Sequence, residues 1–210
     1  MIPFPLMDFK SPESLENIKT MCDQDIGGFS TVNIQHHQAI ESENIPAHMR
    51  WHGTISTDLP RNRPEIQRSG YAAWRSHDRR FTIIGKSLWN VDPFSYLALK
   101  VKSDGRKYFV NIQTDSIVPT DIHQHRLYAK RPGEWETILI FLGAFVRTNH
   151  GQVVEPQGEM LREKVKSIGI GSTDRVVGPY DLSVARIWAT NREDGWHPDD
   201  GTPEPPLKED

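Results

Sequence analysis

Apolar and polar residues alternate with a period of two through much of this chain. In the clearest stretch, polar residues separate Met49, Trp51, Gly53 and Ile55. The same period occurs over residues 97–102 and resumes over residues 108–112. A period of two is typical of a β-strand with one buried face, whereas a helix repeats every 3.6 residues. The pattern therefore predicts half-buried strands in these segments.

Further strands are predicted at residues 32–36, 71–75, 135–142, 165–170 and 182–189. Turns that contain Gly and Pro separate these segments, and no regular succession of strand and helix appears. Many short strands of this kind favour an all-β, antiparallel β-sandwich or jelly roll over a parallel α/β sheet. Between residues 97–102 and 108–112, Ser103-Asp104-Gly105-Arg106 carries an Asp-Gly turn signal and predicts a hairpin.

One short helix is expected near the N-terminus. The segment Ser11-Pro12-Glu13 places an N-cap residue before a proline at the first helical position and an acidic residue in the first turn. The apolar stripe of this helix would consist of Leu15, Ile18 and Cys22. We expect the helix to end before Gly27-Gly28, which can form a turn into the next strand.

The length of 210 residues fits one domain, predicted at residues 1–192. Residues 193–210 carry seven acidic residues, one lysine and four prolines, so they have a formal charge of -6 against +3 for the rest. This composition predicts a disordered, solvated tail. The longest nearly apolar run, residues 138–146, is shorter than the ~20 residues of a membrane-spanning helix. We also expect no secretory signal or transit peptide at the start of the chain.

Sequence motifs for common enzyme sites are missing: there is no Gly-x-Ser-x-Gly, no Walker loop and no His-Glu-x-x-His. Many carboxylates are present, but their spacing does not pair any two as acid and base. His123 and His125 would share one face of a strand, although no third metal ligand can be assigned. Asp8, Asp25 and Asp181 favour turn and cap roles over a calcium site. These residues alone therefore identify neither the catalytic centre of an enzyme nor a cofactor site.

The densest group of arginines lies in one predicted loop and supplies three candidate partner-binding residues, Arg61, Arg63 and Arg68. Arginine is enriched at protein interfaces, and loops of sandwiches often carry binding residues. A nucleic-acid surface is disfavoured because residues 1–192 are only mildly basic. Trp89, beside Asn90 in a connection that contains proline, is predicted as an exposed anchor of the same interface.

Six tryptophans are present, at positions 51, 74, 89, 135, 188 and 196. Trp51 lies on the apolar side of its alternation and Trp135 opens an apolar run, so both are predicted to fill the core. A second interpretation is that tryptophans line a sugar-binding face, which would make the chain a carbohydrate-binding β-sandwich module. That alternative requires exposed, coplanar aromatic rings on one concave sheet face.

A succession of short motifs from residue 4 to residue 191 resembles the complex I intermediate-associated protein family, also called NADH:ubiquinone oxidoreductase complex assembly factor 1. The motifs are Phe9-Lys10-Ser11-Pro12-Glu13-Ser14-Leu15, Asp25-Ile26-Gly27-Gly28-Phe29-Ser30-Thr31, Gly53-Thr54-Ile55-Ser56, Gly70-Tyr71-Ala72-Ala73-Trp74-Arg75-Ser76, Ser103-Asp104-Gly105-Arg106, Ile168-Gly169-Ile170-Gly171 and Gly178-Pro179-Tyr180-Asp181-Leu182. The resemblance implies a galactose-binding-like jelly roll similar to carbohydrate-binding modules.

The resemblance also implies a function. It is that of a non-catalytic assembly factor, a chaperone that binds membrane-arm intermediates of mitochondrial respiratory complex I together with other assembly factors. Members of the family act on the matrix side of the inner membrane, where a peripheral association with that membrane is expected. The family offers no catalytic motif, so the site prediction remains Arg61, Arg63, Arg68 and Trp89.

Overall fold

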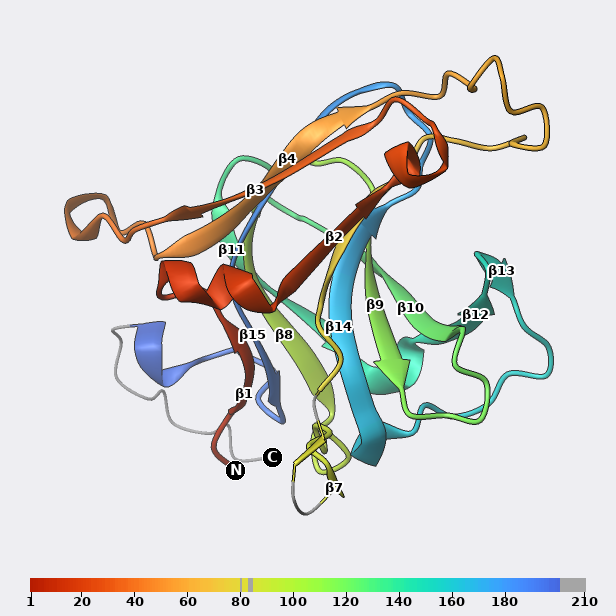
Figure 1. The fold of residues 1–210 in the computed structure, drawn as a ribbon. Coiled ribbons are helices and arrows are strands. Elements are labelled where there is room, and N and C mark those ends of the chain that lie inside the picture. The colour runs from red at the N-terminus through yellow and green to blue at the C-terminus, as the bar shows by residue number, and fades with distance from the viewer. Residues whose placement is uncertain (80, 83–84, 201–210) are drawn as a thin grey trace.

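The computed structural model describes residues 1–79, 81–82 and 85–200. Within these residues the regular structure is mostly strand, and two antiparallel sheets pack face to face (Figure 1). A separate ribbon pairs β6 (Phe81–Thr82) with β7 (Gly85–Lys86). The all-β, antiparallel sandwich predicted from the alternation is confirmed.

We call the first sheet sheet A. Its strands are, in spatial order, β11 (Trp135–Phe141), β8 (Tyr96–Ser103), β15 (Gly178–Thr190), β4 (His48–Ile55) and β3 (Thr31–His37). The strand β1 (Phe4–Asp8) also belongs to it. The 13-residue β15 pairs with β4 along its first half and with β1 along its second half, while β8 borders it on the other side. β15 is therefore the central strand of sheet A.

Sheet B contains seven strands. They are, in order, β13 (Gln152–Val153), β12 (Val146–Asn149), β10 (Asp121–Leu127), β9 (Tyr108–Thr114), β14 (Val165–Ser172), β5 (Ala72–Ser76) and β2 (Ile18–Cys22). Gly169 allows β14 to lie close to β5, because a Cβ at this position would be 2.2 Å from the carbonyl oxygen of Trp74. Only glycine fits this close approach.

The inward-facing residues of both sheets form one core. Trp51 is fully buried at its centre, with ring centroids 4.7 Å from Tyr180 and 5.6 Å from Tyr108. The core prediction for Trp51 is confirmed. The prediction for Trp135 is wrong: this side chain is half-buried on the outer face of sheet A, against the ring of His48. Trp135 stands on the outward side of the alternation along β11, next to buried Glu136.

The strands β8 and β9 do not form the hairpin predicted from the Asp-Gly signal, because they lie in different sheets. The turn itself is present, with Gly105 at a φ of +89°. Asp104 accepts hydrogen bonds from the backbone N–H of Arg106 (2.9 Å), the hydroxyl of Tyr108 (2.9 Å) and the backbone N–H of Asp181 (2.8 Å). The bond to β15 attaches the turn to sheet A while the chain crosses to sheet B.

The predicted N-terminal helix is a 3₁₀ helix, η1 (Pro12–Asn17), which is shorter than expected. Ser11 is its N-cap residue but makes no side-chain capping hydrogen bond. Ile18 and Cys22 lie in β2 instead of continuing the helix, and both are buried. A spacing of four residues satisfies a period of two as well as a period of 3.6, so the pattern alone could not separate the two structures. The remaining 3₁₀ helices are η2 (Asp23–Ile26), η3 (Glu41–Glu43), η4 (Leu142–Ala144), η5 (Arg162–Lys164) and η6 (Pro198–Asp200).

Residues 193–200 pack against sheet A, which differs from the prediction of a free tail that begins at residue 193. His197 is buried, and its ring centroid lies 5.0 Å from that of Trp188. Its Nδ1 accepts a hydrogen bond from Nη1 of Arg186 at 2.7 Å, and Lys10 forms an ion pair with Asp199 at 2.5 Å. The prediction rests on the acidic, proline-rich composition of the segment and does not consider a contact between His197 and Trp188. Residues 201–210, the rest of the predicted tail, lie outside the described residues.

The His197 contact leads to a stability prediction. We expect His197→Ala to lower the free energy of unfolding by about 1–2 kcal/mol, because buried Arg186 loses a hydrogen-bond acceptor. Urea unfolding followed by tryptophan fluorescence would measure this change. His77→Ala, at an exposed position, is the matched control and should change stability little. Equal stability of the two variants would contradict a role for His197 in holding the segment.

A buried histidine in β10 predicts a pH dependence. Burial, and to a lesser extent the charge of Arg147, lower the pKa of His123 below its usual value. The unfolded chain therefore takes up this proton more readily, and stability is lost as pH falls below about 6.5, by at most about 1.4 kcal/mol per pH unit for one group. Comparing urea unfolding at pH 7.5 and pH 5.5 checks this loss. The loss should be smaller in His123→Leu, and an equal loss would assign it to other groups.

Candidate functional site

Three loops meet at one end of the sandwich, and we call this region the loop end. They are residues 23–30, 56–71 and 173–177. Their neighbouring strands hold them together, since Ile55 lies opposite Gly178 and Ser172 lies opposite Ala72. Figure 1 shows the orange loop 56–71 projecting at the top of the molecule, beside the turn that joins β14 to β15.

A buried carboxylate joins the first loop to the second. Asp23 is fully buried and accepts hydrogen bonds from the backbone N–H of Ser30 (2.8 Å), the hydroxyl of Ser30 (2.7 Å) and the backbone N–H of Gly70 (2.6 Å). Gly28 passes so close that a Cβ there would be 2.4 Å from Cγ of Asp23. The motif Asp25-Ile26-Gly27-Gly28-Phe29-Ser30-Thr31 thus supplies both the hydroxyl and the glycine that this contact needs.

A single arginine holds the third loop. Nη1 of Arg106 donates to the carbonyl oxygens of Gly178 (2.9 Å) and Pro179 (2.7 Å). Nη2 donates to the carboxylate of Asp174 (3.0 Å) and to the carbonyl oxygen of Val176. The side chains of Arg106 and Asp174 are only 14% and 7% exposed, so this ion pair is largely shielded from water. Arg106 therefore attaches the loop 173–177 to the turn between β8 and β9.

Four large apolar side chains are exposed on these three loops. Their exposed fractions are 55% for Phe29, 44% for Leu59, 57% for Val176 and 64% for Val177. Single exposed apolar residues are common, but several that gather in one region mark an interaction surface. The sequence analysis missed all four, because they come from three separate loops and follow no periodic pattern.

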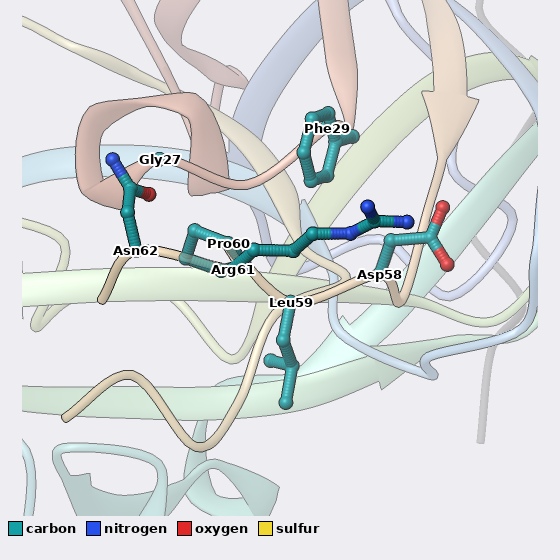
Figure 2. Close-up of a pocket in the computed structure, with 7 residues that line it drawn as sticks. All are labelled: Gly27, Phe29, Asp58, Leu59, Pro60, Arg61 and Asn62. Atoms are coloured by element: carbon teal, nitrogen blue, oxygen red, sulfur yellow. The ribbon is translucent and has the colours of Figure 1, made fainter. Parts of the chain in front are cut away.

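An open hollow of about 570 Å³ lies between the first two loops. Figure 2 shows that the side chain of Arg61 runs beneath the ring of Phe29, with the carboxylate of Asp58 at the end of the guanidinium. Leu59 points away from them, on the other side of the loop. An apolar ring beside a guanidinium can contact both an apolar and an acidic group of a partner.

The three predicted arginines all lie in the loop 56–71 and are exposed. Arg63 is also bound within the molecule, through Glu65 (3.2 Å) and the carbonyl oxygen of Ile26 (3.3 Å). The fold adds Arg175, an exposed residue with a φ of +56° that directly precedes the two exposed valines. The sequence analysis did not select it, because it lies far along the chain from the group of arginines in loop 56–71.

Trp89, the fourth predicted site residue, is only 5% exposed, so its prediction as an exposed anchor is wrong. Its backbone N–H and carbonyl pair with Val165 at 2.9 and 3.0 Å, and the guanidinium of Arg79 lies 4.7 Å from the ring centroid. Val165 begins β14 and Ser172 ends it at the loop end, so Trp89 lies at the opposite end of the sandwich. The connection packs against sheet B instead of projecting from it.

The loop end exposes charged side chains of both signs. Its exposed charges are those of the four arginines and of Asp25, Asp58 and Glu65, which leaves a small positive excess. Among the described residues, no group of three or more His, Cys, Asp and Glu side chains is placed to hold a metal ion. No described helix has the length and apolar character needed to cross a membrane.

Comparison with known proteins relates this chain to one family. The family model of complex I intermediate-associated protein 30 matches residues 7–184. The mitochondrial complex I intermediate-associated protein 30 of Neurospora crassa is 50% identical over 205 residues, which cover 90% of this chain and 74% of that protein. The protein of the same name from Mus musculus is 27% identical over 179 residues, which cover 84% of this chain and only 52% of the mouse protein.

A likeness to a solved structure concerns the fold alone. The family 11 carbohydrate-binding module of a cellulosomal cellulase from Clostridium thermocellum matches with a TM-score of 0.63. The match covers 91% of this chain and 96% of the module, at 15% sequence identity. This agrees with the jelly-roll expectation and assigns no ligand. The extent of the family match and the 50% identity to the Neurospora protein show that this chain belongs to the complex I intermediate-associated protein 30 family.

Proposed function

We propose that this protein is a non-catalytic assembly factor that binds membrane-arm intermediates of mitochondrial respiratory complex I, together with other assembly factors. Membership of the family supports a role in complex I assembly, and relatives named as mitochondrial support that location. We further propose that it acts on the matrix side of the inner membrane, in peripheral association with that membrane. The observation that carries the proposal is the loop end, with its exposed apolar side chains and arginines.

The loop end has the composition of a protein interface. Such interfaces combine an apolar centre with aromatic and arginine side chains, and a few of these supply most of the binding energy. Phe29, Leu59 and the two valines are exposed apolar side chains of these loops, and Arg61, Arg68 and Arg175 are exposed on two of the same loops. Because Asp23 and Arg106 hold the loops in place, binding would order little additional backbone.

The alternative of a carbohydrate-binding module requires exposed, coplanar aromatic rings on one concave sheet face. Four tryptophans, at positions 51, 74, 89 and 188, are buried. Trp135 contacts His48 on sheet A, whereas Trp196 contacts Arg192 in the C-terminal segment. The described tryptophans therefore do not form a coplanar surface on one sheet face.

Affinity capture from gently solubilised mitochondria tests the proposed function. The tagged chain should recover complex I membrane-arm subunits and other assembly factors without the finished enzyme. Replacing Arg61, Arg63 and Arg68 together with alanine should lower this recovery at least about tenfold, since interface arginines often contribute 1–2 kcal/mol each. The variant should keep the circular dichroism spectrum and melting temperature of the parent chain.

A matched control replaces three basic residues outside the three loops of the loop end, Arg131, Arg162 and Lys164, with alanine. Its recovery of complex I subunits should equal that of the parent chain. Equal losses in the two triple variants would contradict the assignment of the loop end. If the parent chain itself recovers no complex I subunits, the proposed function is wrong.

A further inference from the structure

The outer face of sheet A carries a row of side chains that the loop end does not use. The strand registers pair Trp135 with Lys102, Lys102 with Ser183, Ser183 with Arg50 and Arg50 with Gln35. Neighbouring strands lie about 4.8 Å apart, so these five residues stand side by side across five strands. The adjacent residues Val101 and Trp51 face the core, which places the row on the outer surface.

A groove of about 400 Å³ lies over this row, a volume within the range of small-molecule sites. Ile45 and the rings of His48 and Trp135 form its apolar side, with the two ring centroids 5.0 Å apart. His37 stacks on the far side of His48 at 5.0 Å. Nδ1 of His48 donates to the carbonyl oxygen of Pro46 at 2.8 Å, so the ring is held in place.

The two carboxylates in the groove are already occupied. Asp181 accepts hydrogen bonds from Nε of Arg50 (3.1 and 3.0 Å) and from its Nη2 (2.5 Å). Asp104 accepts bonds from Arg106, Tyr108 and the backbone of Asp181, as described above. Burial lowers the pKa of His48, which keeps this ring neutral at pH 7.5. The carboxylate oxygens that line the groove therefore already accept hydrogen bonds from the protein itself.

Hydrogen-bond donors remain on the floor of the groove. Within residues 1–79, 81–82 and 85–200, Nζ of Lys102 has no ion-pair partner and the hydroxyl of Ser183 has no hydrogen-bond partner. Ser183 is nevertheless only 7% exposed. The charges of Lys102 and Arg50 balance those of Asp104 and Asp181, but Arg50 is paired with Asp181 and Asp104 accepts only neutral donors, so the ammonium of Lys102 is the cation left for a ligand. One free charge and one shielded hydroxyl beside an apolar wall match a ligand that is both anionic and apolar.

We propose that this groove binds a monocarboxylate carried on an aromatic or aliphatic group. The carboxylate would contact Lys102 and Ser183, while the apolar group would contact Trp135, His48 and Ile45. A doubly charged phosphate fits less well, since Asp104 and Asp181 border the groove and only one basic side chain lacks a partner. This site is separate from the loop end, so it does not depend on the proposed function.

Nuclear magnetic resonance of the full ¹⁵N-labelled chain would test the site at pH 7.5. The probe is N-acetyl-L-phenylalanine, and N-acetyl-L-phenylalanine amide is its uncharged analogue. The carboxylate should cause saturable shifts of the Trp135 indole N–H and of the amides of residues 102 and 183. Lys102→Met should weaken binding at least about tenfold, whereas Lys102→Arg should keep it within about threefold.

Lys100→Met is the matched control, because Lys100 lies two residues away on the same strand and face but outside the groove. It should bind the carboxylate like the parent chain. Three results would overturn the proposal: equal affinity for the amide, tighter binding of phenyl phosphate, or no saturable shift in a folded parent chain. If the parent chain does not bind the carboxylate but still captures complex I subunits, the groove proposal is wrong and the proposed function stands.

Discussion

Asp23→Ala should lower the free energy of unfolding by at least about 3 kcal/mol. The substitution leaves the buried backbone N–H groups of Ser30 and Gly70 without an acceptor, and the Ser30 hydroxyl keeps only its 3.2 Å bond to the carbonyl oxygen of Ser56. Each buried donor that loses its partner costs about 1–3 kcal/mol, and the missing carboxylate leaves a cavity as well. Domains of this size are stabilised by about 5–15 kcal/mol in total. Urea unfolding followed by circular dichroism would measure the change.

Two further variants make this prediction specific. Asp23→Asn preserves the shape but directs an N–H₂ group at one of the donors, because both carboxylate oxygens accept bonds. We expect its loss to be smaller than that of alanine but still above about 1 kcal/mol. Asp25→Ala, at an exposed position two residues away, should stay within about 0.5 kcal/mol of the parent chain. Similar stabilities of the Asp23→Ala and Asp25→Ala variants would show that the loop end is held by other contacts.

Arg106→Met should cost about 3–5 kcal/mol, the usual penalty for removing one partner of a buried ion pair. The variant leaves the carboxylate of Asp174 shielded and unpaired, and it removes donors from three carbonyl oxygens. Chemical denaturation of the variant would measure the loss. Hydrogen exchange of the amides in residues 173–178 should accelerate before that of the core strands.

A double-mutant cycle separates the ion pair from the other bonds of Arg106. Asp174→Asn removes the negative charge, so adding it to Arg106→Met should cost less than the sum of the two single substitutions. Strict additivity would contradict an energetic coupling between the two side chains. Because Val176 and Val177 belong to the released loop, the Arg106 variant should also recover fewer complex I subunits at a temperature where it remains folded.

The fold class could be predicted because the residues that each strand buries alternate with polar residues along its own sequence. The strand positions around Trp51 and along β8 followed directly from the alternation. The alternation did not predict which strands pair with each other, because pairing depends on contacts between residues that are distant in sequence. The turn at Gly105 shows this: its conformation was predicted, but the bond from Asp181 to Asp104 spans 77 residues and attaches it between two sheets.

The candidate site was predictable only in part, for the same reason. Arg61, Arg63 and Arg68 share one loop, so their proximity was visible in the sequence. Phe29 and Val176 lie on loops that are distant in sequence, and contacts of Asp23 and Arg106 hold these loops at one end of the sandwich. Trp89 was misplaced because a proline-containing connection resembles an exposed loop in sequence, whether or not it packs against a sheet.

The central position of β15 has a consequence for the order of folding. This strand is made near the end of the chain, yet it separates β8 from β4 and also pairs with β1. Among the described strands β1 pairs with β15 alone, so during synthesis from the N-terminus it lacks a partner until β15 has emerged, and β4 can pair only with β3. Contacts between such distant segments fold slowly, because a long loop must close before any pairing energy is gained. Sheet A therefore forms late, and a nascent chain that ends before residue 178 exposes the apolar faces of strands that the finished protein hides.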